Sequence, residues 1–315
     1  MSDQLGFADG WVSAKVGRNA SLERLLVEVD WDRFEVVLSG LRADGVGRPG
    51  FALLLLLKAL LLQQLYALSD AGLEEAINDR VSFRKFLGLS LEAPSPDHTT
   101  LCRFRNRLAE HGLADRLFGE FERQLDQRGL IVKQGTMIDA SLIETPFRPG
   151  SRDGKRRPVD PDAANTARAG RAGGHYGYKV HAGVDLGSRL IRRLLLTLAN
   201  VNDTVPADRL VCGDEQAVYA DRGYAKRARN PWLRAQGIKP RIMHKSWGGG
   251  PPLTRWQWRH NRLIAPRRAA VEGVFATLKR WMSLTCVRYR GLTRNGSHWM
   301  LAALAYNMNR SLKLA

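Results

Sequence analysis

Residues 217–230 and 266–282 have the sequences AVYADRGYAKRARN and PRRAAVEGVFATLKRWM, and both lie in a segment of unusual charge. From Asp221 to Arg310 the chain has 19 Lys or Arg but only two acids, Asp221 and Glu272. A solvated surface normally mixes both signs, so each of these carboxylates needs a reason. Either Arg side chains pair with them, or the positive field serves a polyanion and the two acids hold a cation.

The composition of the whole chain supports a polyanionic partner. The 315 residues are 44% apolar and 25% charged, which is typical of a globular protein, and the net charge is +18. This balance favours a nucleic acid over a small metabolite. A membrane surface would need a basic amphipathic helix or a lipidation signal, and the sequence has neither, so we expect no membrane partner.

Cysteine usage and the apolar segments bear on the cell compartment. Cys102, Cys212 and Cys286 are far apart and without Cys-x-x-Cys spacing, which indicates a reducing cytoplasm and neither a disulfide framework nor a zinc module. The N-terminus lacks the apolar run of a signal peptide. Residues 51–68 are strongly apolar, but Lys58 interrupts the run, so we expect a core helix and not a membrane span.

Residues 1–134 predict a helical domain, because Leu, Val and Phe recur at helical spacing. Its most informative segment is APSPDHTTLCRFRNRLAEHGL, residues 93–113, in which Ser95 followed by Pro96 predicts a helix start. A helix-turn-helix that reads DNA carries polar side chains near the start of its second helix. The candidate DNA-binding residues are Thr99, Thr100, Arg103 and Asn106. A basic surface helix in a bundle is an equal alternative.

The hydrophobic period changes after residue 130, and residues 135–315 predict a second domain. The segments IVKQGTMIDASLIET, HYGYKVHAGVD and RLIRRLLLTLAN favour strands, the last two forming a hairpin. Helices are expected at 203–216, 225–237, 266–282 and 297–312, which gives a mixed sheet with helices packed on it. Residues 146–174 predict a mobile basic loop, and residues 245–266 a Gly/Pro-rich insertion with Trp256 and Trp258.

Three acids of the second domain could form one site. Asp139 and Asp221 are each expected at the end of a strand, where the ligand sites of α/β sheets usually form. Glu272 lies four residues after Arg268 and seven before Lys279, so a helix presents all three on one face. Mg²⁺ would relieve the repulsion among the carboxylates, and two such ions support phosphoryl transfer. Arg268 and Lys279 would then neutralise the phosphate.

Several motifs resemble the DDE-type transposases of bacterial insertion sequences, in particular the group named after insertion sequence five. The similar segments are TMIDASLIET, HYGYKVHAGVD with LTLANVNDT, VYADRGY and RRAAVEGVFATLK, and SPDHTTLCRFRNRL resembles the family's N-terminal DNA-binding region. Asp139 matches the first acidic motif. Asp221, Gly223 and Tyr224 match an Asp-x-Gly-Tyr motif, and Arg268, Glu272 and Lys279 match a Tyr-x2-Arg-x3-Glu-x6-Lys helix in which Ala265 replaces the Tyr.

The resemblance implies a ribonuclease H-like core that uses Mg²⁺ or Mn²⁺ and no nucleotide cofactor. It further implies an enzyme that cleaves double-stranded DNA at terminal inverted repeats, frees a 3′-hydroxyl and joins it to target DNA, as a homodimer on paired ends. Ala265 leaves a hydroxyl contact with DNA in doubt. A catalytically inactive, transposase-derived DNA-binding regulator is therefore the alternative, and a ribonuclease H-like nuclease would share the metal site.

Simpler interpretations of the same residues stay open. Asp221 could be a turn residue, Asp139 a strand-end cap, and Glu272 an ordinary i, i+4 partner of Arg268. Asp203 and Asp185 are rival metal ligands, although a helix cap and a hairpin turn are expected there. Trp256 and Trp258 could stack on unpaired bases, but ordinary packing also explains them.

Overall fold

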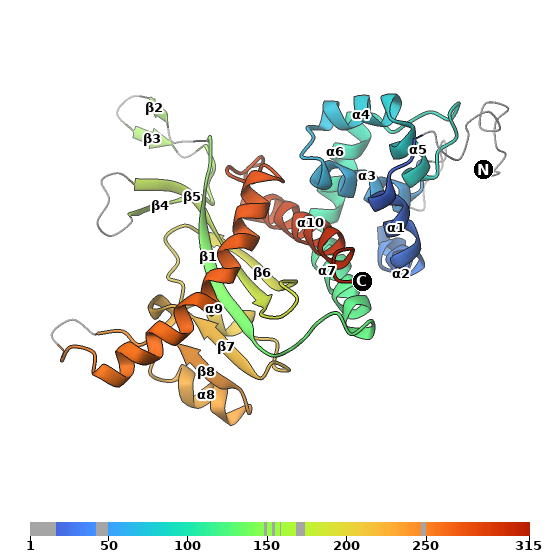
Figure 1. Ribbon diagram of the computed structural model, residues 1–315. Coiled ribbons are helices and arrows are strands. Elements are labelled where there is room, and N and C mark those ends of the chain that lie inside the picture. Colours follow the sequence, from blue (N-terminus) through green and yellow to red (C-terminus); the bar gives the residue numbers. More distant parts are fainter. Residues whose placement is uncertain are drawn as a thin grey trace. The chain divides into compact units, whose positions relative to one another are not determined.

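The computed structural model describes residues 17–41, 50–147, 150–152, 155–157, 159–167, 174–246 and 250–315 (Figure 1). The chain divides into two compact units, residues 1–124 with 300–315, and residues 125–299. The last sixteen residues thus belong with the first unit, which their sequence did not indicate. The roles predicted for residues 1–134 and 135–315 stay predictions.

The first unit is helical, as the spacing of its apolar residues predicts. Its elements are α1 (Ala20–Glu28), α2 (Trp31–Leu38), η2 (Ser39–Leu41), α3 (Leu53–Leu65), α4 (Asp70–Asp79), α5 (Val81–Leu87), α6 (His98–Glu110) and most of α7 (Leu113–Gln127), with the later turns of α10 (Leu292–Ser311). Helix α3 has buried side chains on all sides, which explains its unbroken run of leucines. Among the described residues, no single helix is long and apolar enough to span a membrane.

Helix α6 begins two residues later than the sequence suggests. Its N-cap is Asp97, whose Oδ1 accepts the Thr100 amide at 2.6 Å, and not Ser95. Asp97 is the N-cap instead of Ser95 because its carboxylate accepts a free amide at the helix start and faces the positive end of the helix dipole. Ten residues, 88–97, join α5 to α6, whereas a helix-turn-helix usually has a turn of about three or four. The helix-turn-helix interpretation therefore stays a prediction.

The second unit is built on a six-stranded mixed sheet. The strands are β1 (Thr136–Glu144), β4 (Ala164–Ala167), β5 (Gly174–Asp185), β6 (Ile191–Leu198), β7 (Ala217–Ala220) and β8 (Lys239–Ile242). Antiparallel β6, β5 and β1 are followed by β7 and β8, which run parallel to β1, while β4 pairs with the start of β5. This is the predicted mixed sheet with helices packed on it.

Two predicted segments differ from the structure. Residues 146–174 were expected to be one loop, but they contain β4 and a two-stranded sheet of β2 (Gly150–Arg152) and β3 (Lys155–Arg157). Residues 203–216 were expected to be a helix, yet only η3 (Ala207–Leu210) is helical there, because Pro206 and Gly213 interrupt the segment. The short helix α8 (Arg229–Ala235) follows β7.

Helix α9 (Arg255–Arg280) is longer than predicted. Thr254 and Gln257 form a capping box that starts the helix eleven residues before Pro266, the expected first residue. Pro266 lies inside the helix on its exposed side. The predicted insertion 245–266 therefore ends at Thr254, and Trp256 and Trp258 are helical. Helix α9 packs on β1 and β7 through a stripe that includes Ile264, Val271, Phe275 and Leu278.

A close approach at β5 requires glycine. A Cβ on Gly183 would lie 2.6 Å from the Leu210 carbonyl oxygen and 3.3 Å from Thr136 Cγ2. We expect Gly183→Ala to destabilise the protein by about 1–3 kcal/mol, because the backbone of η3 would have to move. Gly174→Ala on the same strand is the matched control, since its Cβ would meet nothing nearer than 3.7 Å. Urea unfolding of both variants checks this, and equal midpoints would contradict it.

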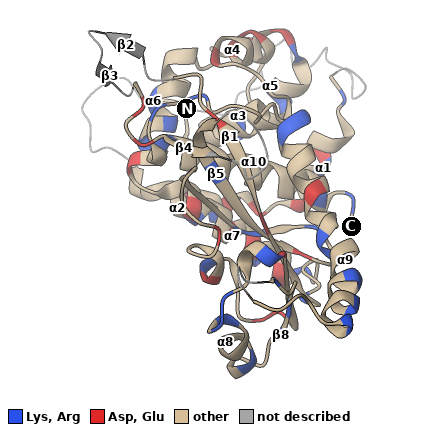
Figure 2. Ribbon diagram, turned by 90° about the vertical axis from the view of Figure 1, so that its left-hand side faces the viewer, with Lys and Arg blue, Asp and Glu red and all other residues tan. Residues whose placement is uncertain are grey.

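Charge is divided unevenly between the units. Residues 125–299 have 32 Lys or Arg and 13 Asp or Glu, whereas residues 1–124 with 300–315 have 17 and 18. Figure 2 shows basic residues along α9 and on α8, and acidic residues on α4. The positive charge that suggests a polyanionic partner therefore belongs to the sheet-containing unit, a result that the total charge alone could not give.

Candidate functional site

Asp139 lies in the middle of β1 and not at its end as predicted, because β1 continues to Glu144 alongside β5. The parallel ladder with β7 nevertheless stops just before it, since the last pair is Ile138 with Ala220. Asp139 and Asp221 are the residues that follow this pair on the two strands. The two acids are therefore neighbours in register at the end of the β1–β7 ladder, although Asp139 is not at the end of its strand.

Asp221 is held by its own motif. Its Oδ1 accepts the Gly223 amide at 2.7 Å and caps η4 (Arg222–Tyr224), so the turn-residue interpretation is correct as a description of its local bonding. A Cβ on Gly223 would lie 2.9 Å from the same oxygen. Tyr224 anchors the turn, because its ring is buried against the core of the sheet. The Asp-x-Gly-Tyr spacing therefore fixes the direction of the carboxylate.

Glu272 and Arg268 reach the same place from α9. The Arg268 guanidinium donates through Nη1 to Asp139 Oδ2 at 2.9 Å and through Nη2 to Glu272 Oε1 at 3.1 Å. The i, i+4 pair of Arg268 and Glu272 is thus present, but it is not the whole interaction. Arg268 and Asp139 side chains are 18% and 17% exposed, whereas Glu272 is 63% exposed. Arg268 links two of the three predicted acids.

The pKa of Asp139 is affected by the other two acids. Burial raises the pKa of Asp139 to about 6, repulsion from Asp221 and Glu272 adds to this rise, and Arg268 opposes it. The ionised form of Asp139 is therefore less favoured in the folded chain than in water, even with Arg268 beside it. Asp139, Asp221 and Glu272 are therefore close enough for the charges of Asp221 and Glu272 to act on Asp139, near the end of the β1–β7 ladder.

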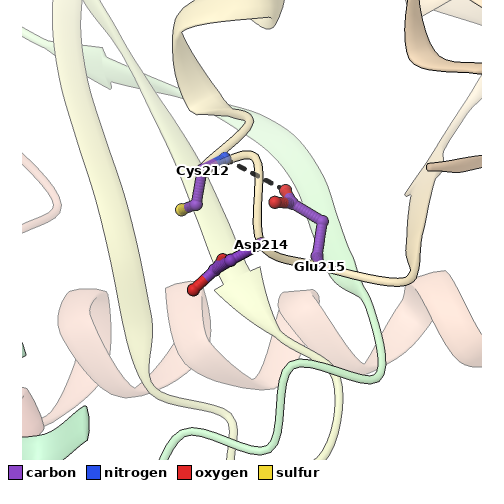
Figure 3. A group of neighbouring side chains, drawn as sticks. All are labelled: Cys212, Asp214 and Glu215. Carbon is purple, nitrogen blue, oxygen red and sulfur yellow. Dashed lines mark hydrogen bonds between the residues drawn. The ribbon is translucent and has the colours of Figure 1, made fainter. Parts of the chain in front are cut away.

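A second acidic group lies elsewhere in the sheet-containing unit. Within the described part of the chain, Cys212, Asp214 and Glu215 are the group whose ligand atoms all lie within 4.8 Å of one another. Figure 3 shows the Glu215 carboxylate turned back to the Cys212 amide, which it accepts at 3.1 Å. Asp214 pairs with Arg192 at 2.6 Å. Their oxygens already serve structural bonds, so we assign no metal to this group.

The carboxylate oxygens of Asp139, Asp221 and Glu272 do not all lie within 4.8 Å of one another. Two ions about 3.5–4 Å apart can be reached by carboxylates that are more widely spaced than those around a single ion. All the donors are carboxylate oxygens, the ligands that hard cations prefer. Arg268 already places one positive charge between Asp139 and Glu272. The types of donor therefore fit a hard cation such as Mg²⁺ or Mn²⁺, whereas their present spacing does not form a site around a single ion.

The other residues predicted to contact DNA lie on α9 and on α6. Lys279 donates to the Leu142 carbonyl at 3.0 Å, so it lies beside β1. Trp256 and Trp258 are each 65% exposed on the first turns of α9, and Trp256 stacks on His260. On α6, Thr99 and Arg103 are exposed and Thr100 and Asn106 half-buried. None of the residues on α6 belongs to the sheet-containing unit.

Lys179 and Asp203 form a polar pair that the sequence did not assign. Lys179 on β5 donates to Asp203 at 2.8 Å and to the Val201 carbonyl at 2.8 Å. Asp203 is therefore a partner of Lys179 and not the helix cap predicted for it. Asp185 Oδ2 accepts hydrogen bonds from the amide and the hydroxyl of Ser188 at the β5–β6 turn, as expected for a hairpin residue. Lys179 and Asp203 both lie in segments that resemble the family, HYGYKVHAGVD and LTLANVNDT. Their contact depends on the pairing of the strands, and no local pattern predicts it.

His181 gives a prediction about acid stability. It is fully buried on β5, its Nε2 lies 2.9 Å from Thr197 Oγ1, and burial lowers its pKa to about 4. The unfolded chain then binds a proton near its usual pKa of about 6.5, while the folded chain stays neutral. Stability should therefore fall as the pH drops from about 6.5 to about 4, by up to roughly 3 kcal/mol.

Denaturant unfolding at pH 7.0 and pH 4.5 measures this contribution. Other groups titrate in the same range, and Asp139 has the opposite sign because its pKa is raised. The difference between the wild-type chain and His181→Gln isolates the histidine. A His181→Gln variant that loses as much stability in acid as the wild type would show that His181 is not responsible.

Family models and a solved structure are similar to parts of this chain. Residues 131–308 match the family described as Transposase DDE domain, and residues 12–107 match Transposase domain (DUF772). The crystal structure of the Mos1 strand transfer complex is similar over 81% of this chain and 83% of that chain, with 11% sequence identity and a TM-score of 0.20. The first match covers more than half of the chain and includes all three acids.

Proposed function

Because this chain belongs to the family of transposases with a DDE domain, we propose that it cleaves DNA at the ends of an insertion sequence and joins the freed 3′-hydroxyl to target DNA. The observation that supports this most is the meeting of Asp139 and Asp221 at the end of the β1–β7 ladder, with Glu272 linked to Asp139 through Arg268. We also propose that the chain belongs to the insertion-sequence-five group of these transposases.

Asp139, Asp221 and Glu272 would hold two divalent ions, Mg²⁺ or Mn²⁺. Bound there, these ions would supply charge stabilisation for the attacking and leaving oxygens in phosphoryl transfer. The chain's own residues set the geometry: the Gly223 amide orients Asp221, and β1 and α9 hold Asp139 and Glu272 on rigid elements. Arg268 contacts Asp139 directly and Lys279 contacts β1 at the Leu142 carbonyl, and both side chains would bind a phosphate.

DNA is the proposed partner, as terminal inverted repeats and as target. The exposed basic side of α9 with Trp256 and Trp258 would contact the backbone and unpaired bases near the cleaved end. Thr99, Thr100, Arg103 and Asn106 on α6 would contribute to end recognition. Two copies of the chain would pair two ends.

A cleavage assay tests the proposal directly. The full chain is incubated with the DNA that flanks its own gene, in Mg²⁺, in Mn²⁺ and in EDTA. We expect nicks at the boundaries of the element that leave a 3′-hydroxyl, in either metal but not in EDTA. Ala265 lies half-buried on α9, three residues before Arg268, and replaces the family's Tyr. End binding without nicking in any metal would favour a DNA-binding regulator instead.

A further inference from the structure

Arg268 occupies the space between two of the acids. Its two terminal nitrogens bond to two different carboxylates, Asp139 at 2.9 Å and Glu272 at 3.1 Å. Glu272 is one helical turn further along α9, and Asp139 is 129 residues away on β1. A planar guanidinium is suited to such a bridge, because its donors point in fixed directions towards two acceptors.

The two carboxylates that Arg268 contacts are also two of the three proposed to hold a metal ion. Asp139 Oδ2 and Glu272 Oε1 both accept from the guanidinium. An Arg side chain has no acceptor and stays charged at every pH in which the protein is folded. A divalent cation between the same two carboxylates would therefore face a fixed positive charge, and the two cannot both use these oxygens fully.

Arg267, the neighbouring cation on α9, makes a different contact. Lys279 donates to the Leu142 carbonyl, and Arg267 donates to the Tyr219 hydroxyl at 3.2 Å. Arg267 is adjacent in sequence, exposed, and on the same helix, yet it donates to a neutral hydroxyl group. The bridge is thus particular to the position of Arg268 on α9.

We propose that Arg268 is a placeholder cation, which joins Asp139 and Glu272 when no divalent ion is bound and releases both oxygens when one binds. The proposal rests on the proposed function, in which these acids hold metal. Released, the guanidinium is free for a DNA phosphate, which it can bind with two parallel hydrogen bonds. Metal binding then makes a phosphate-binding group available beside the acids, so the two events are coupled.

Thermal unfolding of the full chain during a Mn²⁺ titration tests this without any substrate. Arg268→Gln removes the charge and keeps a polar side chain. We expect it to unfold at a lower temperature than the wild type in EDTA, because Asp139 and Glu272 lose their partner. We also expect a given rise in unfolding temperature, whose Mn²⁺ concentration we call the Mn²⁺ midpoint, to need roughly five to ten times less Mn²⁺, since the ion no longer displaces a charge-assisted pair.

Two further variants make the result decisive. Arg267→Gln removes the same charge one residue away and should leave the Mn²⁺ midpoint within about twofold of the wild type. Arg268→Lys keeps the charge without the two-armed geometry, so it should shift the midpoint in the same direction by a smaller factor. It also provides the measurement if Arg268→Gln does not fold.

An unchanged or higher Mn²⁺ midpoint in folded Arg268→Gln would overturn the placeholder role, because Arg268 would then assist the ion or ignore it. Asp139→Ala separates this failure from that of the proposed function. If Asp139→Ala retains the full stabilisation by Mn²⁺, the ion binds elsewhere and the metal site itself is wrong. If Asp139→Ala abolishes the stabilisation and Arg268→Gln tightens binding, both proposals stand.

Discussion

Replacement of Asp139 by Asn is expected to lower the rate of strand cleavage by at least about a thousandfold, which corresponds to roughly 4 kcal/mol of lost transition-state stabilisation. Asn has nearly the same shape as Asp but no charge, so the variant removes a proposed metal ligand and leaves the packing almost unchanged. Gel-based cleavage of end DNA in Mg²⁺ measures the rate, and a mobility-shift assay measures end binding, which should be largely retained.

The stability of Asp139→Asn should not fall as its activity does. Asp139 is partly buried close to Asp221 and Glu272, so its negative charge is repelled in the folded chain. Removing that charge relieves the repulsion, although it also weakens the bond with Arg268. We therefore expect an unfolding temperature within a few degrees of the wild type. An inactive and unfolded variant would not support a catalytic role.

Glu144→Gln is the matched control on the same strand. Glu144 ends β1, is 46% exposed and pairs with His175 at 2.9 Å, at a distance of five residues from Asp139. The same change from carboxylate to amide at Glu144 should leave cleavage within about threefold, because surface pairs contribute little. If Glu144→Gln and Asp139→Asn lowered the cleavage rate equally, any carboxylate-to-amide change on β1 would reduce activity. The loss in Asp139→Asn would then be no evidence for a catalytic role.

The strands and most helices could be predicted from the sequence because their hydrophobic patterns are local. β-branched and alternating residues marked β1, β5 and β6, and helical spacing marked the first unit. The start of α9 could not be predicted from Pro266, because Pro is favoured at a helix start yet tolerated on an exposed face inside a long helix. The capping box at Thr254 was the stronger signal.

The candidate site was predictable only in part. The spacing of Arg268 and Glu272 gives their contact, since residues four apart meet on a helix. The bond from Arg268 to Asp139 depends on α9 crossing β1, and no local pattern contains that information. The partition of charge likewise depends on which residues fold together, as the return of residues 300–315 to the first unit illustrates.

Removal of three exposed arginines from α9 should weaken binding of end DNA by roughly a hundredfold at 0.1 M salt. The changes are Arg255→Gln, Arg259→Gln and Arg262→Gln, all on the first half of the helix and all exposed. Each arginine that contacts a phosphate contributes about 0.9 to the slope of log affinity against log salt, so the slope should flatten by about 2–3. Fluorescence anisotropy between 50 and roughly 300 mM salt measures both quantities.

The same experiment separates phosphate contacts from base recognition. The first unit is close to neutral overall, and α6 begins with the Asp97 carboxylate, whose pKa hydrogen bonds to Thr100 and Thr99 hold at about 2, so it stays negative. We expect Arg103→Gln on α6 to change the salt slope by no more than about 1 and to act on the preference for end DNA over unrelated DNA. If Arg103→Gln flattens the slope as much as the triple change on α9, the positive charge of the sheet-containing unit does not carry the backbone contacts, and DNA lies on the helical unit instead.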